Sequence, residues 1–365
     1  MLHYEKIKSI IKILREKKWR KMKLKGFARP NIIAFFDKDG TTDWKDSEFR
    51  TTLQLFNKMG GLAIPTTGRT GGDVEQDAKK YKVPIRVVIA DNGAIIIDEQ
   101  SNETIDKIKL EESKIAQILD KFEEVGGNKD LIRVTDGKNI YATTDREVRK
   151  YYKNNKVARF SHDLRKDIKS GNIESLTKIT LAGSKDQMQE MADFAEEIGF
   201  WTDMDKTKFP AKRQQNIRLD IAEKGINKGR AVKRTNEIFN PIDGYICIGN
   251  GWNDLSMFKQ AIDDGMVAAI MGDSSRELIE EVKKYQRDIG KGRVIIIPPE
   301  KERANNFFRS FIKLYQQRRE EEQKKSRRKR LPNVERIDVP RTLGEKSQTI
   351  DRRPNSPRRN ITEER

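Results

Sequence analysis

Short apolar runs alternate along the chain with stretches in which apolar residues recur at helical spacing. The apolar runs lie at 32–36, 62–65, 85–90 and 244–248, and the helical stretches include 47–59, 72–81 and 228–239. Short runs of mainly apolar residues are typical of strands that are buried on both faces of a parallel sheet. Strands and helices that alternate with short connections predict an α/β fold with a doubly wound, Rossmann-like parallel sheet.

The pattern changes between residues 98 and 215, where helices mix with isolated strand-like pieces. The parallel pattern then resumes with a strand at 216–221, and two further apolar strands follow at 266–271 and 293–297. We therefore expect a core formed by residues 30–97 and 216–299, with an α+β unit inserted between its two parts.

The two ends of the chain carry most of its positive charge. Residues 1–30 contain 11 Lys and Arg against 2 acidic residues, and residues 301–365 contain 20 against 10, whereas the segment between them has 44 basic and 45 acidic residues. We expect a basic amphipathic helix at 1–29, a basic helix at 300–330 and a disordered basic tail at 331–365.

These ends are candidates for weak binding to nucleic acid or anionic surfaces through residues 1–29 and 318–359. The alternatives are an amino-terminal helix that packs on the protein's own body and a tail that only improves solubility. Both interpretations stay open at the level of the sequence.

Composition excludes several classes of site. A single cysteine, Cys247, leaves no intramolecular disulfide, and two histidines leave no multi-histidine metal site. No apolar run approaches the ~20 residues that span a bilayer, and the amino-terminal residues lack the apolar region of a signal peptide. We expect a cytoplasmic protein without a transmembrane segment.

Polar side chains with complementary chemistry follow the ends of several predicted core elements. They are Asp37 and Asp39 after the first strand, Thr67, Gly68 and Arg69 after the second, Lys228 at a helix start, and Asn250, Asn253 and Asp254 after the strand at 244–248. The carboxyl ends of parallel strands meet at one edge of the sheet. Carboxylate and amide oxygens are ligands that Mg²⁺ prefers. A hydroxyl, the N-terminus of a helix and a lysine can together bind a phosphate. The set therefore predicts a phosphoryl-transfer site in which a carboxylate is the nucleophile.

In order and approximate spacing, these motifs resemble those of the haloacid dehalogenase-like hydrolase superfamily. The segment 90–94 (Ala-Asp-Asn-Gly-Ala), the Lys228-Gly229 pair and the Gly-x-x-x-Asn-Asp form of the last motif are similar to the Cof-like subgroup. The resemblance covers about residues 30–298. It implies that the inserted unit at 98–215 is a substrate-selecting cap. It also implies a Mg²⁺-dependent phosphatase that acts on a small phosphorylated metabolite, with a sugar phosphate as the expected class.

The resemblance also implies a role for each residue. Asp37 would be the nucleophile, Asp39 the general acid and base, Thr67 a ligand of a phosphate oxygen, and Lys228 the neutralising cation. Mg²⁺ would bind Asp37, the main-chain carbonyl of Asp39, Asn250 and Asp254. Substrate contacts are expected from Gly68, Arg69, Asp91, Asn92 and Asn253. Arg133, Lys178, Trp201 and Lys212 are further candidates in the cap.

Three positions depart from the family pattern. Asn250 stands where an aspartate is usual, which removes one negative charge from the metal site. Lys38 replaces an apolar residue but should point away from Asp37 by strand alternation, and Thr42 replaces a leucine. Two alternatives therefore stay open. One is a phosphatase of nucleotide or nucleic-acid phosphate ends that is recruited by the basic termini, and the other is a catalytically weakened protein that binds anions or nucleic acid.

Overall fold

The computed structural model describes residues 29–144, 149, 152, 155–206, 217–298 and 303–330. The chain divides into two compact units, Met1–Arg318 and Arg319–Arg365, and all the sheets belong to the first. The tail expected at 331–365 lies outside the described residues, and so does the helix expected at 1–29 apart from Arg29. Within the described ranges, no helix combines the length and apolar character needed to cross a membrane.

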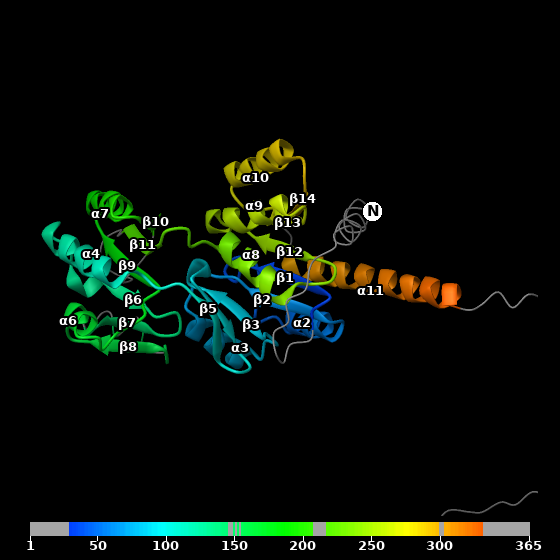
Figure 1. The fold of residues 1–365 in the computed structure, drawn as a ribbon, viewed down its shortest axis with the longest axis horizontal. Helices are drawn as coiled ribbons and strands as arrows, with labels where there is room; N and C mark the ends of the chain where they lie inside the picture. Colours follow the sequence, from blue (N-terminus) through cyan, green and yellow to red (C-terminus); the bar gives the residue numbers. More distant parts are fainter. Residues whose placement is uncertain are drawn as a thin grey trace, which may run out of the picture. The chain divides into compact units, whose positions relative to one another are not determined.

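A parallel sheet of five strands forms the centre of the first unit (Figure 1). In spatial order it contains β14 (Arg293–Ile297), β13 (Val267–Met271), β12 (Tyr245–Gly249), β1 (Ile32–Phe36) and β2 (Gly61–Pro65). Every residue of β1 is buried, and Ile33 is paired with Tyr245 on one side and Leu62 on the other. Because β1 has a parallel neighbour on each side, polar residues that follow it arrive in the middle of the sheet edge. The predicted fold class is confirmed.

Helices connect and cover these strands, and their ends are set by local side chains. They are α2 (Ser47–Lys58), α3 (Gly71–Tyr81), α8 (Lys228–Phe239), α9 (Leu255–Asp263) and α10 (Arg276–Ile289), with a short 3₁₀ turn η3 (Trp252–Asp254) before α9. Asp46 caps α2 by accepting from the N–H groups of Glu48 and Phe49. Asn227 caps α8 by accepting from the N–H of Arg230, which places Lys228 at the first position of that helix.

A second, three-stranded sheet continues the core beside β2. It contains β3 (Val87–Ala90), β4 (Ile95–Asp98) and β5 (Glu103–Lys107), with the 3₁₀ turn η1 (Asp91–Gly93) between the first two. An isolated parallel bridge between Thr66 and Ile89 connects β3 to the end of β2. The strands β3, β4 and β5 pair antiparallel, so the parallel arrangement ends at β3.

The inserted unit is built on a six-stranded sheet, and we call this sheet with its helices the cap. Its spatial order is β10 (Phe200–Lys206), β11 (Ile217–Glu223), β9 (Lys178–Gly183), β6 (Arg133–Thr135), β7 (Ile140–Thr143) and β8 (Ala158–Ser161). The helical elements are α4 (Glu112–Glu124), η2 (Lys129–Leu131), α6 (Leu164–Lys169) and α7 (Lys185–Glu197). Helices α4 and α7 pack against each other beside this sheet (Figure 1).

One predicted strand belongs to a different sheet from the one expected. The strand expected at 216–221 was assigned to the parallel core, but β11 pairs antiparallel with both β9 and β10 in the cap. The apolar pattern of a buried strand does not identify its partners. We therefore propose that the core is interrupted after Lys107, where β5 ends, and resumes after Glu223, where β11 ends.

Helix α11 (Arg303–Arg330) begins in the first unit and packs its aromatic residues on the core. The Phe308 ring meets the rings of Phe36, Phe49 and Phe56 edge to face, with centroids 5.9, 6.0 and 6.1 Å apart. The neighbouring apolar residues Phe307, Phe311, Ile312 and Tyr315 of this helix are also buried. This part of the helix is therefore an integral element of the core, and it contacts the residue that directly precedes Asp37.

Candidate active site

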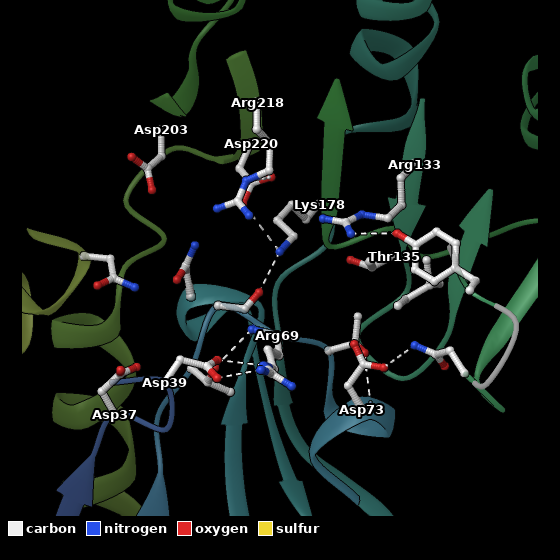
Figure 2. Close-up of a pocket in the computed structure, with 18 of the residues that line it drawn as sticks. Asp37, Asp39, Arg69, Asp73, Arg133, Thr135, Lys178, Asp203, Arg218 and Asp220 are labelled. Carbon is white, nitrogen blue, oxygen red and sulfur yellow. Dashed lines mark hydrogen bonds and ion pairs between the residues drawn. The ribbon is translucent and has the colours of Figure 1, made fainter. Parts of the chain in front are cut away.

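A cavity of about 620 Å³ lies between the carboxyl ends of the core strands and the cap (Figure 2). Its core side is lined by the predicted residues Asp37, Asp39, Thr67, Gly68, Arg69, Asn92, Asn250 and Asn253, together with Thr70 and Asp73. Its cap side is lined by Arg133, Thr135, Ile140, Tyr152, Asn155, Lys178, Asp203, Arg218 and Asp220. Most of the candidate residues from separate motifs therefore converge on one cavity.

Lys228 is fully buried beneath the cavity and bridges two carboxylates. Its Nζ donates to Asp37 Oδ1 at 2.6 Å and to Asp254 Oδ1 at 2.6 Å. Burial raises the pKa of Asp37 to about 6, and the charge of Asp254 adds to this shift while Lys228 opposes it. For Lys228 itself, burial favours a lower pKa, but Asp254 and Asp37 outweigh it and the pKa is raised. The site therefore keeps a permanent cation beside a carboxylate that ionises near neutral pH.

Asp254 lies behind Lys228 and does not line the cavity. Its Oδ2 accepts from the N–H groups of Asn250 and Gly251, each at 2.9 Å, while Oδ1 accepts from Lys228. The loop approaches this carboxylate so closely that a Cβ on Gly249 would lie 2.4 Å from Asp254 Oδ2, which only glycine avoids. The metal-ligand role of Asp254 therefore stays a prediction, and its place outside the cavity lining and its bond to Lys228 favour a role in holding that lysine.

Asp39 turns away from Asp37 toward the cavity mouth and pairs with Arg69 (Figure 2). Arg69 Nε lies 2.6 Å from Asp39 Oδ2, and Nη2 donates to Oδ1. This two-point geometry fixes the orientation of the carboxylate. Arg69 also approaches Asp77 at 3.3 Å, and Lys38 pairs with the same Asp77 at 2.6 Å. Lys38 therefore points away from Asp37, as alternation predicts.

The loop after β2 presents a hydroxyl to the cavity. Thr67 is only 1% exposed, and its Oγ1 accepts from the Arg69 N–H at 3.1 Å. Because Oγ1 already accepts from the backbone, its O–H proton can donate to a ligand. Asn92 holds the loop from the other side, since its N–H donates to the Thr67 carbonyl at 3.0 Å. This geometry suits a phosphate oxygen.

The oxygen donors at the edge of β1 and β12 fit a magnesium ion of modest affinity. The Asp37 carboxylate and the Asn250 amide both line the cavity. The Gly40 backbone, at φ +78°, lies so close to Asn250 that a Cβ there would be 2.2 Å from its Nδ2. The turn that follows Asp39 is therefore adjacent to Asn250. No group of three or more His, Cys, Asp or Glu side chains in the described residues could hold a metal ion. Mg²⁺ needs only one or two carboxylates, because water and substrate phosphate complete its coordination.

Two further sequence candidates, besides Lys228 and Asp254, lie outside the cavity lining. Asp91 was expected to contact substrate, but it is fully buried, and its Oδ2 accepts from the Thr135 and Thr177 hydroxyls at 2.8 and 2.7 Å. It therefore connects the core to two cap elements. Trp201 is partly buried and packs with a small apolar cluster that includes Ala222. Lys212 lies outside the described residues.

The cap side of the cavity contains the sequence candidates Arg133 and Lys178, together with Asp203, Arg218 and Asp220, which the sequence did not indicate. Asp220 on β11 is 2% exposed. Burial favours a higher pKa for Asp220, but Lys178, Arg218 and Arg133 outweigh it, so the pKa is lowered. Arg133 donates to the Tyr152 hydroxyl at 2.7 Å. No short motif marks these positions, because their partners come from strands that are distant in sequence.

Comparison with known proteins agrees with this fold. A family model described as haloacid dehalogenase-like hydrolase matches residues 34–289. No curated protein matches the chain. A haloacid dehalogenase-like hydrolase from Bacteroides thetaiotaomicron is 20% identical, with a TM-score of 0.58 over 76% of this chain and 98% of the other.

Two further solved structures show the same similarity. A protein from Plasmodium vivax described as a HAD/COF-like hydrolase is 16% identical, with a TM-score of 0.57 over 80% of this chain and 98% of the other. A second Bacteroides thetaiotaomicron protein, described among the phosphatases of this superfamily, is 14% identical, with a TM-score of 0.54 over 82% of this chain and 97% of the other. The resemblance inferred from the motifs is confirmed: the chain belongs to the haloacid dehalogenase-like hydrolases and has the fold of their Cof-like members.

Proposed function

We propose that the protein is a Mg²⁺-dependent phosphomonoester hydrolase that works through an aspartyl-phosphate on Asp37. The observation that carries this proposal is the arrangement of Asp37, whose Oδ1 is 2.6 Å from the buried Lys228 while the side chain lines the cavity. A carboxylate can attack an anionic phosphate only where cations offset their mutual repulsion. Lys228 provides one such charge in a site that water reaches poorly.

Each proposed step uses a group that lines the cavity or lies directly beneath it. In the first step, an Asp37 oxygen forms a bond to phosphorus and the bond from phosphorus to the ester oxygen breaks. Asp39, protonated once its two-point pair with Arg69 opens, donates its proton to the leaving alcohol. In the second step, Asp39 takes a proton from a water molecule as its oxygen bonds to phosphorus. The bond from phosphorus to Asp37 then breaks and inorganic phosphate is released. Thr67 and Lys228 bind phosphoryl oxygens in both steps.

Mg²⁺ would be held by the Asp37 carboxylate, the main-chain carbonyl of Asp39 and the Asn250 amide oxygen. When bound, it would neutralise part of the phosphoryl charge. Asn250 has a second role in this chain, because its Oδ1 also accepts from the Thr41 hydroxyl at 3.3 Å. The neutral amide provides less charge than a carboxylate, so we infer a metal affinity below that expected for an all-carboxylate site.

The cavity favours a small, hydroxylated phosphate ester as the substrate. Its lining is dominated by charged, amide and hydroxyl side chains, and Ile140 is the one aliphatic residue larger than glycine among the lining residues that the structure describes. Such a surface offers hydrogen-bond partners for a polyol but little area for an apolar leaving group. A sugar phosphate therefore remains the proposed substrate class. The second Bacteroides thetaiotaomicron protein is described among phosphatases, which is the same activity class.

The alternatives that involve nucleic acid have no support in the described residues. Of the proposed anion-binding segments, 1–29 and 318–359, residues 1–28 and 331–359 lie outside them. The recruitment of nucleic acid by the termini, and the cytoplasmic location, therefore stay predictions.

A panel of phosphate esters tests the proposal. The purified protein should release inorganic phosphate from at least one small ester when Mg²⁺ is present and should lose this activity with a chelator. Asp37→Asn should be inactive, whereas the matched Asp43→Asn variant, at an exposed position of the same loop, should retain the activity. Failure of the intact protein to turn over any ester would overturn the enzymatic proposal, and activity that survives in Asp37→Asn would show that the nucleophile is a different residue.

A further inference from the structure

Lys178 is a buried lysine that extends from the cap to the core. It is the first residue of β9, only 3% exposed, and its Nζ donates to the main-chain carbonyl of Gly68 at 2.7 Å. Two carboxylates stabilise the ammonium there, since Asp91 Oδ1 lies at 3.5 Å and Asp220 Oδ2 at 3.7 Å. Figure 2 shows Lys178 between the cap strands and the core loops. Removing a lysine ammonium from water is costly, so this side chain is held in place by specific buried partners and does not make a chance surface contact.

The carbonyl that Lys178 contacts belongs to a peptide group that acts directly on Thr67. The peptide bond between Gly68 and Arg69 carries that carbonyl on one side and the Arg69 N–H on the other. The N–H donates to Thr67 Oγ1 at 3.1 Å. Hydrogen bonds arranged in series polarise one another, so the ammonium strengthens the bond from the N–H to the hydroxyl. The Thr67 hydroxyl is thereby fixed as an acceptor from the backbone, and its proton is directed to the cavity.

The same loop is fixed by the core on its other side. The N–H of Asp91 donates to the Arg69 carbonyl at 2.9 Å, and the N–H of Asn92 donates to the Thr67 carbonyl at 3.0 Å. Both donors have positive φ, 46° and 55°, so the backbone there is held in a conformation that costs energy for residues other than glycine. The core therefore holds two carbonyls of the loop, and the cap, through Lys178, holds the third.

We infer that Lys178 is a positioning residue that makes the orientation of the Thr67 hydroxyl depend on the seating of the cap. The inference rests on the proposed phosphatase function. With the cap seated, the ammonium, the Gly68–Arg69 peptide and the Thr67 hydroxyl form one chain that ends at the phosphate position. With the cap displaced, Lys178 leaves the carbonyl and the hydroxyl loses this constraint. Thr67 therefore binds the phosphoryl group most strongly when the cap covers the cavity.

A double-mutant cycle between Lys178 and Thr67 tests this coupling, with p-nitrophenyl phosphate and Mg²⁺ as the probe. We expect Lys178→Met to lower kcat/KM about tenfold, the loss typical of one hydrogen bond to a charged group. In a Thr67→Ala background the same change should lower it less than about twofold, because residues that act through one another are not additive. Equal losses in both backgrounds would overturn the inference.

Lys107 provides the matched control for a lost lysine–carbonyl bond between core and cap. Its Nζ donates to the main-chain carbonyl of Asp136 at 2.8 Å, outside the set of residues that line the cavity. Lys107→Met should therefore leave kcat/KM within about twofold of the wild-type value. A tenfold loss in Lys107→Met as well would show that any weakened cap contact suffices, and would overturn a specific role for Lys178.

Lys178→Met leaves the carboxylates of Asp91 and Asp220 without their shared cation. A second variant is therefore needed to separate the effect of this unpaired negative charge from the loss of the Gly68 contact. Lys178→Met/Asp220→Asn removes one negative charge together with the positive one, and Asp220→Asn alone is its reference. The inference predicts the same tenfold loss between these two proteins, and no loss would overturn it. If the intact protein turns over no ester, the proposed function fails instead. The inference is then tested by the binding of orthovanadate. Lys178→Met should weaken this binding about tenfold, and Lys107→Met should leave it unchanged. An unchanged orthovanadate affinity in Lys178→Met would contradict the inference.

Discussion

Lys228 Nζ and Asp254 Oδ1 lie 2.6 Å apart at a point where neither side chain is exposed to solvent. We propose that Asp254 holds the lysine against Asp37 from below, because its Oδ1 accepts from Lys228 Nζ behind the cavity lining. Asp254→Asn should therefore lower kcat at least about tenfold, as Lys228 moves away from the phosphoryl position. The Mg²⁺ concentration for half-maximal rate should stay the same.

Stability measurements on the same variant provide a second readout. Removing one partner of a buried ion pair costs about 3 kcal/mol, which urea unfolding should detect in Asp254→Asn. The control is Asp106→Asn, because Asp106 pairs with Arg230 and Arg234 of the same helix at a partly exposed site. That variant should lose less than about 1 kcal/mol. A raised Mg²⁺ requirement in Asp254→Asn would contradict the positioning role and restore the metal-ligand one.

Asn250 provides a test of the metal site by gain of charge. Asn250→Asp adds a carboxylate to the cavity lining that includes Asp37, so the half-saturating Mg²⁺ concentration should fall about tenfold. Asn253→Asp is the matched control, since Asn253 lines the same cavity and gains the same charge. Calorimetric titration of Mg²⁺ into both variants separates the cases. An equal change in both would mean that general electrostatics is responsible and that Asn250 does not bind the metal.

The parts of the site that follow directly from strands were predictable from the sequence. Asp37 follows five buried apolar residues, and Thr67 follows the neighbouring strand, so parallel pairing alone brings them together. Lys228 was predictable for a related reason, because Asn227 provides a helix cap directly before it. In each case a local sequence pattern determines at which end of a strand or helix the residue lies. The pairing of the strands then brings these ends together at one edge of the sheet.

Residues whose partners are distant in sequence could not be placed in this way. Asp91 looked like a cavity residue because it follows β3, but Thr135 and Thr177 enclose it, and nothing in the sequence pairs them with it. Likewise, β11 was assigned to the parallel core, since an apolar run reveals burial but not the direction of its neighbours. The contact between Lys178 and Gly68 depends on this cap topology, so it could not be predicted from the sequence either.

The pKa of Asp37 predicts an acidic limit to catalysis. The nucleophile must be ionised, and its pKa is raised from 3.8 to about 6, so at low Mg²⁺ kcat/KM should fall about tenfold per pH unit below pH 6. A bound cation favours the carboxylate, so a higher Mg²⁺ concentration should shift this limb to lower pH. A pH profile recorded at two Mg²⁺ concentrations checks both statements. A limb that stays at the same pH would argue against metal binding by Asp37.

The same pKa has a consequence for stability without metal. Because the folded state raises the pKa of Asp37, it favours the protonated form, and the stabilisation that this form provides is lost as pH rises from 3.8 to about 6. Asp37→Asn mimics the protonated carboxyl, so it should increase the free energy of unfolding more at pH 8 than at pH 4. Urea unfolding at both pH values measures the difference. The same effect at both would show that burial does not penalise this charge.

Phe308 connects α11 to the strand that carries the nucleophile, although α11 lies beyond the residues that the family model matches. Its side chain is 1% exposed and contacts three other phenylalanine rings. Phe308→Ala should therefore cost about 3–5 kcal/mol of unfolding free energy through lost burial and the cavity left behind. Phe160, which is 37% exposed, is the matched control, and Phe160→Ala should cost less than about 1 kcal/mol. Equal stability of Phe308→Ala and Phe160→Ala in urea unfolding would show that α11 is not part of the core.

The same change should also affect catalysis. Since Phe36 directly precedes Asp37, Phe308→Ala should lower kcat in the fraction of the protein that remains folded.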